Sequence, residues 1–380
     1  MRSFFSSHPF FRFTVFGLFV TVTSLVLLCH SALYAQNSEI QEVFRSVADR
    51  ISPCVVRIET TGGNERIGQF FTLPETTGVI LTADGWIISS SVGFAHQPDA
   101  IFITLADGTR HLANLIMTDR NRKLSLLKIN LPENALPLPV PVTAPKKSFR
   151  VGQWTLTLGR VLDAESPSMT LGVLSATNRI WGKAIQTDAA VSLNNYGGPL
   201  VDMEGRVMGI LTPFSMDMAG GNPQKNPSSP ETPPGPSPQI PGMPAQEPSK
   251  PVTPAEEAIQ GIDLYDSGIG FAIPLEDIYH LLPRMQEGKL ELAAPLGVSF
   301  GKEVPIFALA VIQNVQKDST AEKAGFKTGD KILTVNDVPV QTAAEVRHQL
   351  FPLYAGDQIK FKILQNKETL EISVILDVLK

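Results

Sequence analysis

The chain has 380 residues, of which 43% are hydrophobic and 18% are charged. This balance is typical of globular proteins with a sizeable core, and the length suggests two or three domains. The formal net charge is −5, and no cluster of Lys and Arg marks a nucleic-acid-binding face, which argues against nucleic-acid partners.

The N-terminus, over 1–35, has the organisation of a secretory signal peptide. Arg2 and Arg12 accompany an uncharged apolar stretch over 13–28, and small residues follow up to Ala35, after which we expect cleavage. An uncleaved anchor is the alternative, although the stretch is short for a membrane span. Either case exports the rest of the chain, so we expect it in the periplasm or cell envelope, tethered to the membrane if the signal stays.

The expected mature chain keeps a single cysteine, Cys54, which excludes an internal disulfide and a cysteine-based metal site. Cys54 begins a short apolar run, so a buried position in a strand is favoured over a reactive thiol. The histidines at 111, 280 and 348 are scattered and show no metal-ligand spacing. We therefore expect neither a metal nor a cofactor.

A short helix is expected over 39–52, and short strands separated by turns follow it. Asp-Gly pairs at 84–85 and 107–108 stand between apolar runs, which is typical of β-hairpins. Long helices do not alternate with these strands, so a parallel α/β sheet is not expected. Many short strands at this spacing indicate an all-β sandwich or barrel.

The segment 213–258 differs in composition from the rest. Thirteen of the chain's 30 prolines fall within 213–254, mixed with Gly, Ser, Asn and Gln. Such a segment cannot bury enough apolar surface to fold, which predicts a disordered or polyproline-rich loop. The apolar run at 269–274 predicts one more strand of the preceding barrel, so the loop is an insertion within a domain over 36–291.

The last part of the chain, over 292–380, predicts a second and smaller unit. A helix that ends before Gly325 is expected near 319–324, and another begins with a capping box at Thr342 and Glu345. Apolar runs predict strands at 307–315, 331–335, 358–364 and 370–376.

Several blocks of sequence resemble the HtrA (Deg-type) family of trypsin-like serine proteases. They occur in the order and spacing of that family, at 77–81, 84–88, 124–129, 185–190, 197–200, 268–274 and 323–332. The resemblance covers nearly the whole expected mature chain outside the proline-rich loop. It implies a mainly β fold, in which a chymotrypsin-like double β-barrel over 36–291 is followed by a PDZ domain over 292–380.

The resemblance also locates the catalytic triad, and none of its three positions holds the required residue. Serine proteolysis needs a hydroxyl nucleophile, an imidazole base and an orienting carboxylate. The His position falls at Val92, the Asp position at Lys123 and the Ser position at Tyr196. Asn194 replaces the Gly whose amide would help to form the oxyanion hole. We therefore expect no catalytic residue in this chain.

Two other residues are candidate substitutes for members of the triad. His96 lies four residues after Val92, and Ser192 lies four residues before Tyr196. Each would have to move by about 5–6 Å, one helical turn, to take over the role. Lys123 would still repel an imidazolium, so a substitute triad is not expected.

The PDZ unit keeps what peptide binding requires. Domains of this class add a C-terminal peptide as a strand and hold its carboxylate with backbone amides. By resemblance the carboxylate loop contains Leu296, Gly297 and Val298. Val346 and Leu350 lie one helical turn apart. Their side chains either face the groove or only pack the small core.

Three functions remain open at the level of sequence. The first is a non-catalytic, exported scaffold, adaptor or chaperone-like protein that binds C-terminal or unfolded peptides of envelope proteins. The second is an active serine endopeptidase of envelope quality control, against which the missing triad argues. The third is a regulatory subunit that assembles with active relatives. Because relatives commonly form trimers, its partners would be either active relatives, in a mixed assembly, or other copies of this chain, in a homotrimer.

Overall fold

The computed structural model describes residues 40–62, 66–67, 70–71, 75–95, 97–161, 167–192, 195–214, 268–301 and 308–379. The predicted signal peptide, most of the proline-rich loop, His96 and Asn194 lie outside the described residues. The chain divides into two units, Met1–Arg50 and Ile51–Lys380. A helix occupies 40–51, close to the expected bounds. Within the described ranges, no helix combines the length and the apolar character needed to cross a membrane.

The first barrel closes through six antiparallel strands. In spatial order these are β1 (Val55–Thr61), β4 (Glu75–Ile80), β5 (Trp86–Ser90), β8 (Leu124–Ile129), β7 (Arg110–Asp119) and β6 (Ala100–Thr104). Inward-facing aliphatic side chains such as Ile58, Ile87 and Leu127 fill its interior. The Asp-Gly turns join β4 to β5 and β6 to β7, and Gly85 and Gly108 have the positive φ that such turns favour.

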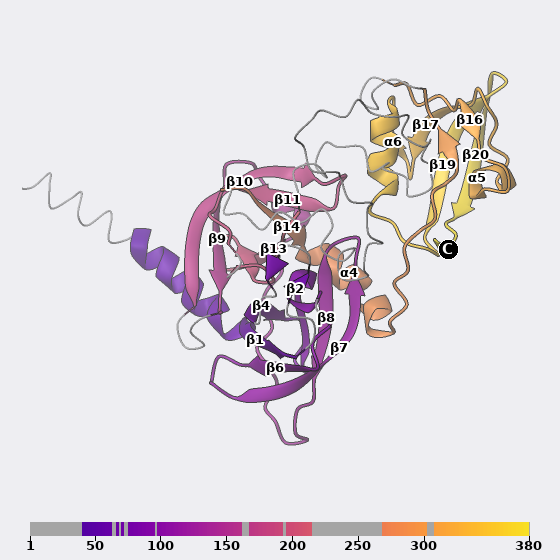
Figure 1. Ribbon diagram of the computed structural model, residues 1–380. Helices are drawn as coiled ribbons and strands as arrows, with labels where there is room; N and C mark the ends of the chain where they lie inside the picture. The colour runs from indigo at the N-terminus through magenta and orange to yellow at the C-terminus, as the bar shows by residue number, and fades with distance from the viewer. Residues whose placement is uncertain are drawn as a thin grey trace, which may run out of the picture. The chain divides into compact units, whose positions relative to one another are not determined.

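The second barrel also has six antiparallel strands (Figure 1). In spatial order these are β10 (Ser168–Arg179), β11 (Ala184–Thr187), β14 (Gly270–Pro274), β13 (Val207–Thr212), β12 (Pro199–Val201) and β9 (Trp154–Gly159). Strand β13 pairs directly with β14, although the chain between them includes the proline-rich segment. The chain therefore leaves and re-enters the same barrel.

Short elements connect and follow the barrels. They are the 3-10 helices η1 (Ser52–Cys54), η2 (Ser91–Phe94) and η3 (Lys146–Ser148), the strand pair β2 (Arg66–Ile67) and β3 (Phe70–Phe71), and helix α4 (Leu275–Gln286). Cys54 is a buried free thiol, and burial raises its pKa to about 11. This thiol is therefore protonated at neutral pH, which suits the expected structural role.

The part of the chain that follows the barrels, from residue 292 on, packs two small sheets and two helices around one apolar core. Its parts are the sheet β18 (Val338–Pro339), β17 (Lys331–Val335), β19 (Gln358–Gln365) and β20 (Glu368–Ile375), the pair β15 (Val298–Ser299) and β16 (Asn314–Val315), and the helices α5 (Thr320–Lys323) and α6 (Ala343–Leu350). The capping box of α6 is present: the Thr342 hydroxyl accepts from the Glu345 amide, and the Glu345 carboxylate accepts from the Thr342 amide.

The fold class is thus the expected one, a double β-barrel followed by a PDZ domain, with one local difference. A continuous strand is expected over 307–315, but within the described residues 308–315 only Asn314–Val315 forms a ladder, with β15. Leu309 instead bridges Thr342, and Val311 bridges Lys331. The segment changes partner every two or three residues, so no single ladder extends along it.

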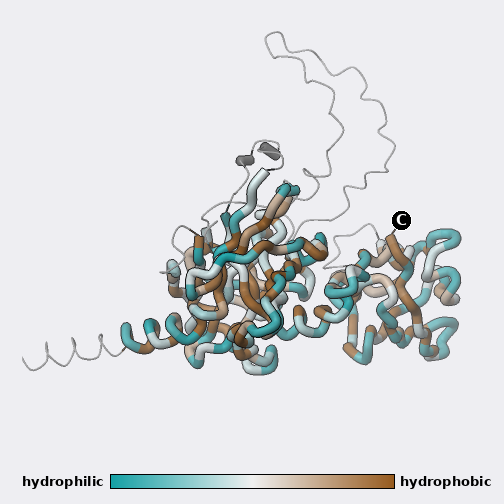
Figure 2. Tube along the Cα trace, turned by 90° about the horizontal axis from the view of Figure 1, so that it is seen from below, coloured by the Kyte–Doolittle hydropathy of each residue, from teal (hydrophilic) through white to brown (hydrophobic). Residues whose placement is uncertain are grey.

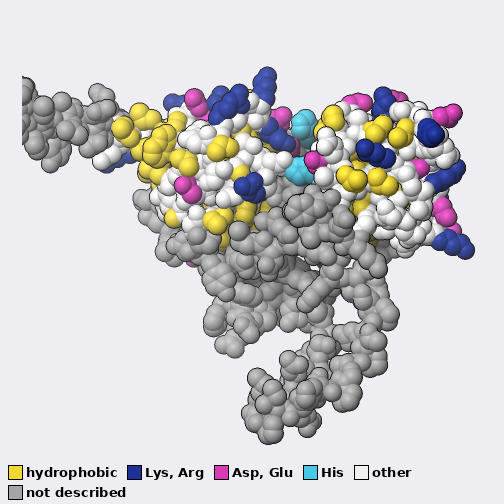
Figure 3. Space-filling view, turned by 90° about the horizontal axis from the view of Figure 1, so that it is seen from above, with side chains coloured by type: hydrophobic (Ala, Val, Ile, Leu, Met, Phe, Trp, Pro, Cys, Tyr) yellow, Lys and Arg dark blue, Asp and Glu magenta, His cyan; other side chains and the backbone are white. Residues whose placement is uncertain are grey.

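The side chains are distributed as this architecture requires. Apolar stretches of the trace concentrate in the β-rich parts, and polar stretches at the turns (Figure 2). On the face shown in Figure 3, basic and acidic side chains both occur, with apolar side chains between them. This mixed surface agrees with the modest net charge of −5.

Candidate functional site

The segments that carry the three predicted triad positions meet where the two barrels adjoin. The Ser91 amide, next to Val92, donates to the Lys123 carbonyl at 2.9 Å, and the Thr77 amide donates to the Tyr196 carbonyl at 3.4 Å. Gly197 has φ +83, and a Cβ there would lie 2.0 Å from the Thr77 carbonyl oxygen. Only glycine allows this approach of the second barrel to the first, so the sequence block around it serves the geometry of the fold.

Val92 lies in η2 and is only 8% exposed. The 3-10 helix is capped by Ser90, whose hydroxyl accepts from the Val92 amide at 3.4 Å. An aliphatic side chain at this position has no atom that can accept a proton. The local backbone is thus hydrogen-bonded, and Val92, at the position where the resemblance predicts a general base, cannot act as one.

Lys123 is buried, with 7% of its surface exposed, and has φ +58. Burial, and next the charge of Arg120, lower the pKa of its ammonium group, while Asp119 acts in the opposite direction. A positive charge here would oppose an imidazolium, which a catalytic carboxylate would stabilise.

Tyr196 places its side chain in the core of the second barrel. It is 5% exposed and belongs to the apolar cluster that includes Leu174, Ile185 and Leu211. Its carbonyl accepts from the Thr76 hydroxyl at 3.2 Å, which ties the backbone to the first barrel. The Tyr196 side chain is therefore a packing group, and it does not direct a hydroxyl at a substrate carbonyl.

The loop before Tyr196 is held by Asn195. The Asn195 side-chain oxygen accepts from the Ser192 amide at 3.3 Å and from the Ser192 hydroxyl at 3.2 Å. Its amide nitrogen donates to the Thr157 hydroxyl at 3.3 Å. Ser192, the candidate substitute nucleophile, thus donates to an amide oxygen, which does not activate it as a base would. Asn194 lies outside the described residues.

Beside Lys123, a buried polar network connects the first barrel to the small C-terminal domain that follows the barrels. The Tyr354 hydroxyl donates to Asp119 and accepts from Arg122, and the Arg122 guanidinium also donates to the Pro352 carbonyl at 2.9 Å. Asp119 and Arg122 form an ion pair at 3.9 Å with almost no exposure. Burial, and then the charge of Asp119, raise the pKa of Tyr354, so it remains a neutral hydrogen-bond donor.

A second set of contacts extends this connection. The rings of Trp181 and Phe351 stack at 5.7 Å, and the Lys183 ammonium group lies 5.0 Å from the centre of the Phe351 ring. Lys183 also donates to the Asn121 side-chain oxygen at 2.7 Å. Burial lowers the pKa of Lys183 to about 8. Sequence reasoning missed these residues, because the chain offers no signal for contacts between segments so far apart.

The predicted peptide-binding residues of the PDZ domain come together, with different exposure. Leu296 and Val346 belong to the core, at 6% and 0% exposed, and Val298 and Leu350 are partly buried against it. Gly297 has φ +84, and a Cβ there would lie 2.2 Å from the Ser319 Cβ, so the loop requires glycine. The complete burial of Val346 makes it a packing residue in this conformation, whereas Leu350, on the same helix α6, is only partly buried.

A metal centre has no support in the described part of the chain, where no group of three His, Cys, Asp or Glu side chains is placed to hold an ion. The residues at the predicted triad positions are aliphatic, cationic and aromatic.

Comparisons with known proteins agree with both the double barrel and the PDZ domain. Residues 76–210 match the trypsin-like peptidase domain family, and residues 294–376 match the PDZ domain family. A "Probable periplasmic serine endoprotease DegP-like" of Pseudomonas putida (strain GB-1) is 25% identical, with 94% of this chain and 75% of the relative covered. Another of that name, from Rickettsia conorii, is 27% identical over 80% of this chain and 53% of the relative, so the chain spans about half of its length.

Solved structures show the same fold. The "HtrA-type protease AlgW with decapeptide" aligns with a TM-score of 0.58 at 22% identity, covering 89% of this chain and 99% of that one. The serine endoprotease from Yersinia pestis aligns with a TM-score of 0.55. The fold and the site therefore define a trypsin-like double barrel with a C-terminal PDZ domain. In sequence and in the order of its domains, the chain is similar to DegP-like endoproteases and to HtrA-type proteases.

Proposed function

We propose that this chain is a non-catalytic member of the HtrA-type family that binds peptides of envelope proteins through its PDZ groove. The observation that carries the proposal is the set of side chains at the former triad: Val92 is aliphatic, Lys123 is a buried cation and Tyr196 packs into a barrel core. The names of the relatives place those proteins in the periplasm, which supports an exported location together with the N-terminal sequence.

The size of the catalytic loss supports a binding role. Removing the nucleophile or the base of a serine protease lowers turnover by about 10⁶, which corresponds to roughly 8 kcal/mol of transition-state stabilisation. This chain lacks both groups and the orienting carboxylate as well. Binding, in contrast, needs only the loop around Gly297 and an accessible apolar contact such as Leu350.

Peptide capture by the PDZ domain is tested by titration calorimetry of the whole mature chain. We expect a free-acid peptide with an apolar last residue to bind at about 1 μM, near −8 kcal/mol. The amidated form of the same peptide should bind far more weakly, because it lacks the carboxylate that the loop amides hold. Equal affinity for the two forms, or no binding of either, contradicts the proposed role. A protein of the same fold, the HtrA-type protease AlgW, has been solved with a decapeptide, which supports a peptide as the ligand.

An active endopeptidase is the second candidate, favoured by the names of the relatives. A fluorophosphonate probe distinguishes the two, because it reacts covalently with a serine that a neighbouring base activates. We expect no labelling of this chain under conditions that label an active family member. Labelling at any serine supports the endopeptidase and refutes the non-catalytic role.

A further inference from the structure

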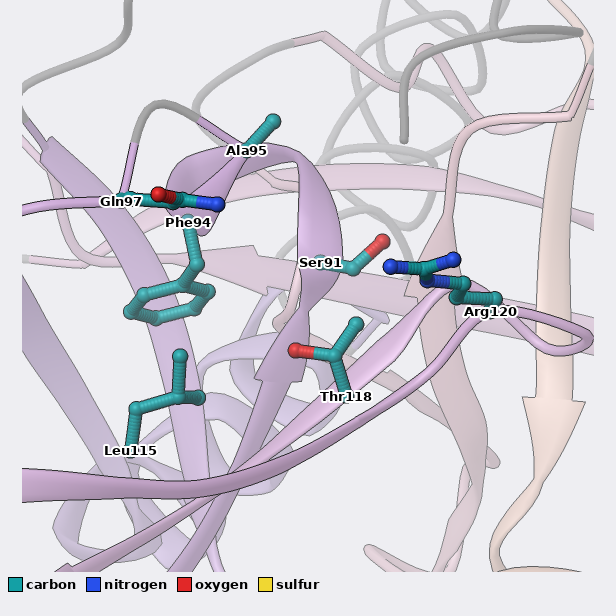
Figure 4. Close-up of a pocket in the computed structure, with 7 residues that line it drawn as sticks. All are labelled: Ser91, Phe94, Ala95, Gln97, Leu115, Thr118 and Arg120. Carbon is teal, nitrogen blue, oxygen red and sulfur yellow. The ribbon is translucent and has the colours of Figure 1, made fainter. Parts of the chain in front are cut away.

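A small open pocket of about 180 Å³ lies on the first barrel beside the former base position. Strand β7 and the segment from η2 onward form its walls, and Ser91, one of the lining residues, directly precedes Val92 (Figure 4). Pockets that enclose a whole small molecule are larger, about 300–1,000 Å³. The volume here suits one side chain, so a segment of polypeptide is a better occupant than a free metabolite.

The two ends of this pocket differ in chemistry. Phe94 and Leu115 face each other at one end, and Leu115 is 38% exposed. At the other end the Ser91 hydroxyl points toward the Arg120 guanidinium, with Thr118 close by. The pocket therefore offers an apolar contact and a set of hydrogen-bond donors within the reach of one residue or two neighbouring residues.

The donors at the polar end are available to a ligand. Arg120 is exposed, and within the described residues no ion pair or hydrogen bond of its side chain is found, nor one of the Ser91 hydroxyl. The nearest acid along the chain, Asp119, is buried and already engaged by Arg122 and Tyr354. The charge of Arg120 is also felt at Lys123, so an anion here would offset repulsion between two cations.

We infer that this pocket is a second peptide-binding site, which takes a carboxylate together with an adjacent apolar side chain. The carboxylate lies against Arg120 and the Ser91 hydroxyl, and the apolar side chain lies between Phe94 and Leu115. The carboxylate comes from a chain terminus or from an Asp or Glu next to the apolar residue. The site goes beyond the PDZ groove and does not depend on it.

The test uses the mature chain with Leu350→Lys, which removes the apolar contribution of the PDZ groove. Three fluorescein-labelled peptides of otherwise identical sequence are compared by fluorescence anisotropy at low salt. One ends in Leu with a free carboxylate, one ends in Glu-Leu-amide, and one ends in Gln-Leu-amide. The first two distinguish the source of the carboxylate, and the third carries none.

We expect at least one acidic peptide to bind more tightly than the Gln-Leu-amide peptide, by up to about fivefold, since an exposed ion pair contributes up to about 1 kcal/mol. Arg120→Glu should remove this advantage, and 0.5 M salt should reduce it. The matched control Lys147→Glu changes the net charge equally at another exposed site and should leave binding unchanged.

The apolar half of the pocket is tested by Leu115→Ser, which should weaken all three peptides. Far-UV circular dichroism verifies that each variant is folded. The inference is overturned if the three peptides bind alike, if Arg120→Glu has no more effect than Lys147→Glu, or if none of them binds. The titration that tests the PDZ groove uses the chain with Leu350 intact, and repeating it with Arg120→Glu separates binding in the groove from binding in this pocket.

Discussion

Tyr196 has a backbone at the junction of the barrels and a side chain in the core of the second barrel. The sequence locates this position through the following Gly197-Gly198 pair, because those glycines are needed where backbones approach closely. It does not indicate the direction of the phenol, since a tyrosine can equally point into a cleft. The packing role emerges only from the structure.

Restoring the nucleophile alone should therefore damage the fold without restoring chemistry. We expect Tyr196→Ser to lower the free energy of unfolding by about 3 kcal/mol, because removal of a large buried side chain leaves a cavity. Urea unfolding measures this loss, and Tyr196→Phe, which keeps the ring, should cost much less. A loss below about 1 kcal/mol or fluorophosphonate labelling of the new serine contradicts this account.

Lys183 predicts a pH dependence of stability. Its pKa is lowered to about 8 in the folded chain from an ordinary 10.5, so between these values the unfolded state binds more protons. The energetic penalty of the buried charge is fully present below pH 8 and is relieved as the pH rises. Stability should therefore increase from pH 8 to 9, with a slope of at most about 1.4 kcal/mol per pH unit. Cys54, whose pKa is raised from 9.0 to about 11 on folding, acts in the opposite direction near pH 9 and does so equally in the unchanged chain and in a lysine variant.

The measurement for this prediction is urea unfolding at a series of pH values, with Lys183→Met compared with the unchanged chain. The variant should lose much of the rise between pH 8 and 9, while Lys123 retains a smaller contribution in the same direction. An unchanged slope in Lys183→Met means that the charge of this lysine is not penalised in the fold.

At the scale of elements, the sequence predicts the regular parts well. The Asp-Gly hairpins, the capping box of α6 and the barrel strands follow from local patterns of turn residues and alternating apolar residues. Local patterns do not predict the pairing of the segment expected as a strand over 307–315, because the partners of its described residues lie in three different parts of the PDZ domain. The pocket beside Ser91 also escapes prediction, since it arises from segments that are distant in sequence.

Helix α6 carries Val346, which packs in the core, and Leu350, which we expect to contact a peptide. Val346→Lys places a charge at a fully buried site and should destabilise the domain by several kcal/mol, roughly 3 or more. Leu350→Lys changes a partly exposed site, so it should leave thermal unfolding nearly unchanged while weakening apolar free-acid peptides about tenfold. Thermal unfolding and peptide titration of both variants measure the difference. Equal destabilisation by the two changes contradicts the assignment.

At the scale of the whole molecule, the contacts of Tyr354 join the PDZ domain to the segment that precedes Lys123, the predicted Asp position of the triad. Tyr354→Phe removes the hydroxyl that both Asp119 and Arg122 use, which should cost about 1–3 kcal/mol. Hydrogen exchange of the amides over 119–123 should rise. Tyr279→Phe is the matched control, because its hydroxyl donates to the Leu81 carbonyl elsewhere. Similar exchange in both variants would show that Tyr354 does not fix this segment.

The central claim is that the HtrA-type fold serves binding here without peptide hydrolysis. The most direct measurement is turnover of unfolded casein by the purified mature chain, with and without a fluorophosphonate, beside an active family member as positive control. We predict cleavage indistinguishable from buffer, because Val92, Lys123 and Tyr196 stand at the predicted triad positions. Cleavage above buffer that the fluorophosphonate abolishes would contradict the account.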